Sequence, residues 1–281
     1  MKELSRRIPR KISRPFAAAT AGAFALVAIA SYAGQAGAPA GQQPSGQTPP
    51  GRQGGPGRGR DFGVKPLEET GFTEIFDGKT LKGWDCDPDF WRVENGSIVG
   101  ETKIDHQPPQ NIFCIWKGGQ PGNFELKLQY RLTGVNNGNS GIQYRSIERP
   151  DVAKWVMQGY QFDIDLKQMF TGQIYEERGR GFVAMRGQLA YVPPDKKPGS
   201  IGSLGTTEQL RGFIKDDDWN DVHIIARDNV LIQLLNGHVM SSLIDDDTAN
   251  RKMQGEIGIQ LHRLPNCSMK METRNIRLKT L

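Results

Sequence analysis

Apolar and polar residues alternate in a series of short stretches from about residue 70 to the end of the chain. Phe124–Leu132 shows the pattern most clearly, and Asn139–Arg145 and Gly159–Asp165 repeat it. A period of two residues is that of a β-strand with one buried face. We therefore predict strands there. Further strands are expected at Trp91–Val93, Ser97–Val99, Ile112–Trp116, Thr171–Glu176, Val222–Ala226, Val230–Leu235, His238–Leu243, Gly255–Leu261 and Ser268–Leu278.

Turn residues separate these stretches. Asn236-Gly237 lies between two of the predicted strands, and Asn-Gly is the strongest two-residue signal for a hairpin. About a dozen short strands with almost no helix predict an all-β protein, an antiparallel β-sandwich or jelly roll. The one helix that we expect is Thr206–Ile214, inside an irregular stretch, Glu177–Gly212. A loop of that length is typical of a functional or disordered segment.

The first part of the chain has another composition. Residues 1–16 are basic, Ala17–Ala30 is an apolar run of small residues, and small-residue cleavage sites follow. This order predicts a secretory signal peptide over residues 1–38. The apolar run is shorter than the ~20 residues that span a bilayer, so we expect membrane contact only during export. The predicted location is secreted or periplasmic.

Residues 39–66 are rich in Gly, Pro, Gln and Arg, which predicts a disordered linker, and residues 67–281 are left as one folded domain. Residues 1–60 hold 9 of the 36 Lys and Arg residues but 1 of the 31 Asp and Glu residues. The remainder therefore has 27 basic against 30 acidic residues, a net charge of −3 in place of the overall +5. This balance removes the electrostatic argument for nucleic acid as a partner.

Three cysteines, Cys86, Cys114 and Cys267, allow at most one disulfide within the molecule, and the sequence leaves the pairing open. Without a CxxC pair or two histidines at helical spacing, a zinc site has no support. We predict no cofactor. Calcium is conceivable on such a scaffold, but we expect Asp216–Asp218 and Asp245–Asp247 to be solvated turns. The oligomeric state is not predictable.

Two of the alternating stretches place polar side chains on what could be one common sheet face. These side chains are Gln143, Arg145, Gln161, Asp163 and Asp165. A solvated face gives the same pattern, since antiparallel sheets commonly leave one side to water. The functional interpretation is a polar cleft on a β-sandwich.

An ordered series of motifs resembles the 3-keto-disaccharide hydrolase family. The motifs are Gly71-Phe72, Phe76-Asp77-Gly78-Lys79, Leu81, Gly83-Trp84, Asn139-Ser140-Gly141-Ile142, Arg145, Gly159-Tyr160-Gln161, Thr171-Gly172, Tyr175-Glu176, Trp219-Asn220, Asn236-Gly237, Gly258-Ile259-Gln260 and His262. The resemblance extends from about Thr70 to Thr280. It implies a concanavalin A-like (lectin/glucanase) jelly roll that acts on sugars oxidised at C3.

A ketone at C3 makes the C2 proton of a glycoside acidic, so cleavage needs a base, a donor for the enolate oxygen and an acid for the leaving group. Asp163 is the candidate base or acid, although a structural pair with Arg145 is the alternative. His262 suits proton transfer because its ordinary pKa is near neutral. Glu176 is a further candidate acid or sugar-binding group. Arg145 would hold the enolate or a hydroxyl through its forked donors. The expected hydroxyl-binding residues are Gln143, Gln161, Gln260 and Asp165.

Two other functions remain open. Asp163 and Asp165 could be the carboxylate pair of an ordinary glycoside hydrolase, because two residues along a strand are separated by roughly 6.6 Å. Alternatively, the domain could bind carbohydrate without catalysis, with Trp116, Trp155 or Tyr160 as sugar platforms, although aromatic residues of this size are more often core. In all three interpretations the partner is a carbohydrate.

Overall fold

The computed structural model describes residues 70–281. The predicted signal peptide (1–38) and linker (39–66) lie outside these residues, as do the first three residues of the predicted domain. Within the described part of the chain, no helix is both long and apolar enough to cross a membrane.

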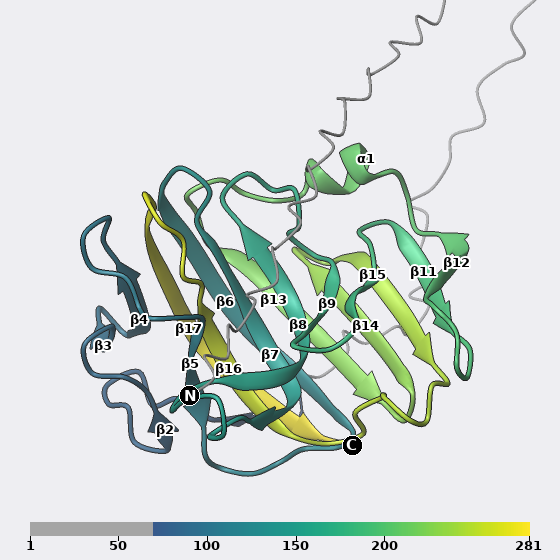
Figure 1. Ribbon diagram of the computed structural model, residues 1–281, viewed down its shortest axis with the longest axis horizontal. Coiled ribbons are helices and arrows are strands. Elements are labelled where there is room, and N and C mark those ends of the chain that lie inside the picture. Colours follow the sequence, from purple (N-terminus) through teal and green to yellow (C-terminus); the bar gives the residue numbers. More distant parts are fainter. Residues whose placement is uncertain (1–69) are drawn as a thin grey trace, which may run out of the picture. The chain divides into compact units, whose positions relative to one another are not determined.

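Two β-sheets pack face to face (Figure 1). The ten-stranded sheet has the order β12-β11-β15-β14-β13-β6-β17-β4-β3, with β1 beside β17. Its strands are β1 (Thr73–Glu74), β3 (Trp91–Glu94), β4 (Ser97–Thr102), β6 (Phe124–Val135), β11 (Gln188–Val192), β12 (Gly199–Ser203), β13 (Asn220–Arg227), β14 (Val230–Leu235), β15 (His238–Asp245) and β17 (Ser268–Thr280).

The seven-stranded sheet has the order β10-β9-β8-β7-β16-β5-β2. Its strands are β2 (Trp84–Asp85), β5 (Ile112–Trp116), β7 (Asn139–Glu148), β8 (Met157–Asp165), β9 (Ile174–Glu177), β10 (Gly181–Ala184) and β16 (Glu256–Leu261). Neighbouring strands in both sheets are antiparallel except β11 and β15, which run parallel. The predicted all-β jelly-roll sandwich is therefore confirmed.

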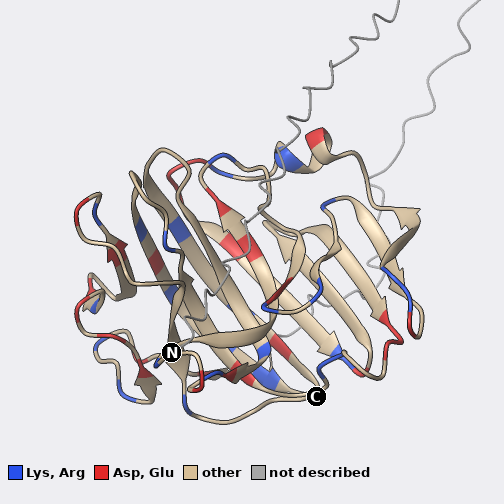
Figure 2. Cartoon of the chain, viewed as in Figure 1, with Lys and Arg blue, Asp and Glu red and all other residues tan. Residues whose placement is uncertain are grey.

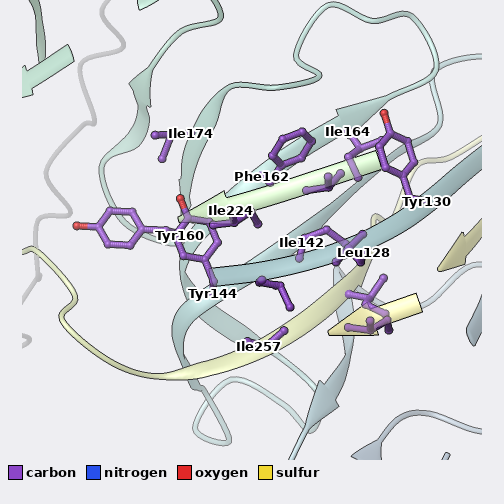
Figure 3. Packing of buried hydrophobic residues seen from close by; sticks show 14 of the residues in the cluster. Leu128, Tyr130, Ile142, Tyr144, Tyr160, Phe162, Ile164, Ile174, Ile224 and Ile257 are labelled. Atoms are coloured by element: carbon purple, nitrogen blue, oxygen red, sulfur yellow. The ribbon is translucent and has the colours of Figure 1, made fainter. Parts of the chain in front are cut away.

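The core lies between the sheets, where the alternating apolar residues of both meet (Figure 3). Ile142 and Phe162 come from the seven-stranded sheet, and Leu128 and Ile224 come from the ten-stranded sheet. Every second residue of β6 from Phe124 is buried, as its sequence predicts. Since the core takes one face of each strand, the alternate residues of the same strands lie on the outer faces.

Local signals place several elements where the sequence predicts them. The turn between β14 and β15 has Asn236 at φ 48° and Gly237 at φ 82°, the two positive angles of the turn that Asn-Gly favours. Thr206 caps α1 (Thr207–Arg211) and forms a capping box with Gln209. The helix is shorter than predicted: it ends at Arg211, and Gly212, which still has helical backbone angles, is its C-cap.

The prediction of a long loop over Glu177–Gly212 is wrong. The stretch contains β10, β11 and β12. β12 is an edge strand whose residues are mostly exposed, so it has no buried face to produce an alternating pattern. β11 obtains its place by parallel pairing with β15, a contact between residues some fifty positions apart (Leu189 with Ser242). The local sequence therefore predicts neither the edge strand β12 nor the pairing of β11 with β15.

Of the three cysteines, Cys86 and Cys114 form the disulfide, and Cys267 is free and buried. The disulfide ties the segment after β2 to β5, with 4.2 Å between the two Cα atoms. Acidic and basic residues of the domain occur in the loops and on strands such as β6 and β17, whereas β11, β12 and β14 contain none (Figure 2).

Candidate active site

A hollow of about 240 Å³ lies on the outer face of the seven-stranded sheet. It is lined by side chains from β7, β8, β9, β10 and β16 and from the segments beside them. The lining residues are Asn111, Asn139, Gln161, Asp163, Phe170, Tyr175, Glu177, Phe182, Gln260 and His262. Four of the predicted site residues are among them: Gln161, Asp163, Gln260 and His262.

Strand alternation and one glycine build the floor of this hollow. On β8, Phe162 and Ile164 point into the core, so Gln161 and Asp163 point outward. Gly141 on β7 pairs with Asp163 on one side and with Gln260 on the other. A Cβ at Gly141 would lie 2.4 Å from Cδ of Gln161, so only glycine lets the Gln161 amide lie across this strand.

Asp163 is held by three hydrogen bonds that all reach Oδ1. The donors are Asn139 Nδ2 at 3.2 Å, Gln161 Nε2 at 3.3 Å and the Ile164 amide at 3.1 Å. None of the described residues donates to Oδ2, which leaves that oxygen for a ligand or a proton. Burial raises the pKa of Asp163 to about 8, and the nearby charge of Asp165 adds to the rise. Asp163 is therefore mostly protonated at neutral pH.

A chain of side-chain hydrogen bonds ends at Asp163. Ser146 Oγ donates to Gln143 Oε1 at 2.5 Å, and Gln143 Nε2 donates to Gln161 Oε1 at 3.1 Å. The amide of Gln161 then donates to Asp163. Gln143 is fully buried and does not line the hollow, so it positions Gln161 and does not bind substrate as predicted.

His262 follows β16 directly and has one ring nitrogen committed to the backbone. Nδ1 lies 3.0 Å from the carbonyl oxygen of Arg263. A carbonyl oxygen only accepts, so Nδ1 carries the proton and Nε2 keeps its lone pair when the ring is neutral. Burial lowers the pKa of His262, although the hydrogen bond to Arg263 opposes the shift. The hollow is therefore lined both by the neutral imidazole of His262 and by the protonated carboxyl of Asp163.

Glu177 is a site residue that the sequence analysis missed. It accepts hydrogen bonds from Gln260 Nε2 at 3.2 Å and from Asn111 Nδ2 at 3.4 Å. Burial raises the pKa of Glu177, and both hydrogen bonds oppose the shift. Gln260 Oε1 is buried and has no hydrogen-bond partner among the described residues. Buried polar atoms are normally paired, so this oxygen is available to accept a hydrogen bond from a hydroxyl group of a ligand.

Three aromatic residues, Phe170, Tyr175 and Phe182, form one side of the hollow, and we call them the aromatic wall. The rings of Phe170 and Phe182 stack with centroids 5.5 Å apart, and Tyr175 meets Phe182 edge-on at 5.0 Å. The three aromatics that the binding-module interpretation predicted as platforms do not line the hollow. Tyr160 lies in the core, Trp116 is packed against the core, and Trp155 donates to Asp85 at 2.8 Å.

Arg145 does not belong to the site, which corrects the predicted shared face. Strand β7 is irregular after Tyr144, and Arg145 has a φ of 46°. Such a bulge re-aims a side chain away from the face that alternation assigns. The guanidinium donates to the carbonyl oxygens of Asp228 at 2.7 Å and Gly122 at 2.9 Å. Arg145 therefore joins the end of its sheet to the β13–β14 turn of the other sheet, and it neither pairs with Asp163 nor reaches a substrate.

Glu176 was predicted as a catalytic residue, but it points away from the hollow. It shares the inward face of β9 with Ile174, and its side chain pairs with Arg180 at 2.5 Å. Arg180 also pairs with Asp245 at 2.6 Å and with Asp247 at 3.4 Å. The expectation that Asp245–Asp247 is a solvated turn is therefore wrong for its first and last residues, which are buried. The sequence Ile174-Tyr175-Glu176-Glu177 gave no unambiguous alternation, because Ile174 and Tyr175 are both apolar.

Asp165, predicted to bind substrate, anchors a loop and does not line this hollow. Its carboxylate accepts the backbone amides of Met169, Phe170 and Thr171 at 2.9, 2.8 and 2.9 Å. These contacts hold the turn between β8 and β9 and thereby place Phe170 in the aromatic wall. Asp163 and Asp165 are thus not a catalytic pair across one hollow.

Within residues 70–281, no group of three or more His, Cys, Asp or Glu side chains is arranged to hold a metal ion. The chemistry that the residues of this hollow support is proton transfer between a neutral imidazole, a protonated carboxyl and a second carboxyl, next to amides that suit hydroxyl groups.

The family profile and a curated relative place the chain among carbohydrate-active proteins of the glycoside hydrolase type. The chain belongs to the family described as the 3-keto-alpha-glucoside-1,2-lyase-like domain, whose sequence profile matches residues 71–279. The predicted family is thereby confirmed.

The chain is similar to a 3-keto-disaccharide hydrolase of Bacteroides thetaiotaomicron, with 35% identity over 94 residues. That match covers 30% of this chain and 30% of the relative's length. Among solved structures, a candidate glycosyl hydrolase from Parabacteroides distasonis is 18% identical with a TM-score of 0.46, over 75% of this chain and 94% of the other. The carbohydrate-binding module CBM66 from Bacillus subtilis is 12% identical with a TM-score of 0.45, over 70% and 96% of the two chains.

Proposed function

We propose that the protein is an exported enzyme that cleaves glycosides oxidised at C3, by elimination across C2 and C1. The observation that carries the proposal is the pair of neutral acid–base groups in one hollow, Asp163 with a raised pKa and His262 with a lowered one. An environment that raises the pKa of a carboxyl and lowers the pKa of an imidazole leaves both groups neutral. The carboxyl can then act as an acid and the imidazole as a base near neutral pH.

His262 is the base in this proposal. Its Nε2 takes the proton from C2, and the electrons of the C2–H bond move into the enolate whose charge rests on the C3 oxygen. The Nδ1–H bond to Arg263 keeps the ring in the tautomer with the lone pair on Nε2. Tyr175, half-buried at the rim of the aromatic wall, has a hydroxyl with no partner among the described residues and is our donor for the enolate oxygen.

Asp163 is the acid. The enolate electrons re-form the C3 carbonyl, a double bond forms between C1 and C2, and the C1–O bond breaks. The leaving oxygen takes the proton from Asp163 Oδ2, the oxygen that carries no internal hydrogen bond. Addition of water across C1 and C2 then completes a net hydrolysis, while release before hydration gives a lyase product. Both outcomes use the same first step.

The remaining polar residues suit the sugar hydroxyls. Gln260 Oε1 accepts from a hydroxyl and so gains the partner that it lacks. Glu177 accepts a second hydroxyl beside Gln260 and Asn111. Pockets that enclose a whole ligand have volumes of about 300–1,000 Å³, so a hollow of about 240 Å³ suits one sugar ring and leaves the aglycone at its exposed rim.

A second candidate function rests on Glu177. Asp163 and Glu177 are two carboxyls with raised pKa values in one hollow, which is also the equipment of an ordinary glycoside hydrolase. The two functions differ in what happens to the bond between C2 and its hydrogen. Elimination must break the C2–H bond, and ordinary hydrolysis leaves it intact.

The decisive experiment is to incubate the purified protein in D₂O with a 3-keto glucoside and with the matching unoxidised glucoside. We expect aglycone release from the 3-keto substrate alone, together with either deuterium at C2 of the hydrated sugar or an unsaturated sugar that has lost its C2 hydrogen. His262→Ala should lower this release at least ~10²-fold. Equal release from both glucosides without deuterium at C2 would contradict the elimination and support the carboxylate pair of Asp163 and Glu177.

Export is part of the proposal, and the disulfide supports it. Structural disulfides such as Cys86–Cys114 persist in oxidising compartments outside the cytosol. With the basic, apolar and small-residue order of residues 1–38, this favours a secreted or periplasmic enzyme. N-terminal sequencing of the protein from outside the cytoplasm should find a start between about Gly34 and Gly41. A retained Met1 in that fraction would show that no cleavage occurs.

A further inference from the structure

The two sides of the hollow differ in chemistry. Asn111, Asn139, Gln260 and His262 make one side polar. The opposite side is the aromatic wall, whose only polar atom beyond the backbone is the hydroxyl of Tyr175. Asp163, the proton donor to the leaving group in the proposed function, rises from the floor of the same hollow. A glycoside bound here would place its sugar ring and its leaving group in unlike surroundings.

The aromatic wall is partly exposed although it is apolar: Phe170 and Tyr175 are half-buried and Phe182 is exposed. Phe182 is 39% exposed, and Met169 and Met185, which neighbour Phe170 and the end of β10 along the chain, are 60% and 41% exposed. Exposed apolar groups next to a polar hollow are typical of a ligand site. The wall is also held in place: Phe182 is fixed by stacking on Phe170, and Phe170 by the loop that Asp165 anchors. A fixed aromatic surface binds a flat ring at a low entropic cost.

We propose that the aromatic wall is the subsite for the leaving group and that the preferred substrate is a 3-keto glycoside of a planar aromatic alcohol, a phenol. This inference rests on the proposed function and specifies its substrate class. A second sugar ring would bring several hydroxyls that need hydrogen-bond partners, and the wall offers one. An aromatic ring needs none and gains stacking and edge-to-face contacts with Phe170 and Phe182.

The test compares three substrates of the same enzyme: phenyl 3-keto-glucoside, methyl 3-keto-glucoside and a 3-keto disaccharide. In Phe182→Ala we expect KM for the phenyl substrate to rise ~10-fold with kcat changed less than ~3-fold. The methyl and disaccharide substrates should change by less than ~2-fold. Phe182→Leu, which retains apolar volume without the ring, should show the same selectivity if Phe182→Ala folds poorly.

Phe213→Ala is the matched control, because Phe213 is similarly exposed, at 37%, but lies outside the hollow and stacks on His238. It should leave all three substrates unchanged. An equal loss on the disaccharide and the phenyl substrate would overturn the inference, since the wall would then be a sugar platform.

Binding separates this inference from the proposed chemistry. Calorimetry with unreactive phenyl and methyl glucosides should show at least ~10-fold tighter binding of the phenyl compound to the wild type, and Phe182→Ala should abolish the difference. Equal binding of the two glucosides overturns the inference even if 3-keto glycosides are cleaved. Selective phenyl binding without any turnover of 3-keto glycosides instead contradicts the proposed reaction.

Discussion

Asp163→Asn is expected to lower turnover by ~10²-fold or more and at the same time to stabilise the folded domain. The asparagine side chain retains an oxygen that can accept the three hydrogen bonds now made to Oδ1. It cannot donate a proton to a leaving group, so the proposed elimination loses its acid. It also cannot ionise, so the folded state no longer contains a buried carboxyl that resists charging.

The stability gain should depend on pH in a defined direction. The pKa of Asp163 is about 8 in the folded state, against an ordinary value near 3.8. Between these values the folded state binds a proton that the unfolded state lacks, so wild-type stability falls as pH rises and levels off above pH 8. The advantage of Asp163→Asn should therefore grow from about pH 4 to pH 8, on the order of a few kcal/mol at most.

Urea unfolding of both proteins at several pH values measures this difference. Asp165→Asn is the matched control, two residues along the same strand. It removes a carboxylate that accepts three loop amides, so we expect a loss of stability, ~1–3 kcal/mol, in place of a gain. An Asp163→Asn protein that retains full turnover would place the acid elsewhere, and one that is less stable at pH 8 would show that the carboxyl contributes to the fold.

Arg180→Met is expected to destabilise the domain strongly, because Arg180 holds three buried carboxylates. Arg180 pairs with Glu176 at 2.5 Å, with Asp245 at 2.6 Å and with Asp247 at 3.4 Å. The side chains of all three acids are at most 5% exposed. Lys252 lies 3.8 Å from Glu176 and compensates only one of them. Removing one partner of a buried ion network costs ~3–5 kcal/mol, because the remaining charges stay buried.

Arg178→Met is the control for this prediction. Arg178 is exposed, and its side chain donates to Gln110 at 3.2 Å, so its replacement should cost less than ~1 kcal/mol. Urea unfolding at neutral pH compares the two variants. If Arg180→Met unfolds at the same urea concentration as Arg178→Met, then the carboxylates of Glu176, Asp245 and Asp247 do not depend on Arg180.

The site was predictable where strand alternation persists. Gln161 and Asp163 lie on the outer face of β8 as the pattern predicts, and Gln260 and His262 follow the same rule on β16. Arg145 departs from the rule, because one residue with a positive φ reverses the direction of its side chain. Glu177 was missed for another reason. Ile174 and Tyr175 are both apolar, so the sequence does not show which of them faces the core. In the structure Ile174 packs into the core, and Glu177 therefore lies on the outer face and lines the hollow.

The sequence by itself determined the fold class, because alternation and turn residues are local signals that repeat through the domain. The ordered series of motifs from Gly71 to His262 indicated the family through its resemblance. It also predicted four residues of the hollow, Gln161, Asp163, Gln260 and His262. The tertiary structure decided which cysteines pair, where β11 and β12 lie and which glutamate lines the hollow. It also raised the pKa of Asp163 and built the aromatic wall from β9, β10 and a loop. These properties depend on burial and on contacts between distant residues, and neither is present in the order of residues along one strand.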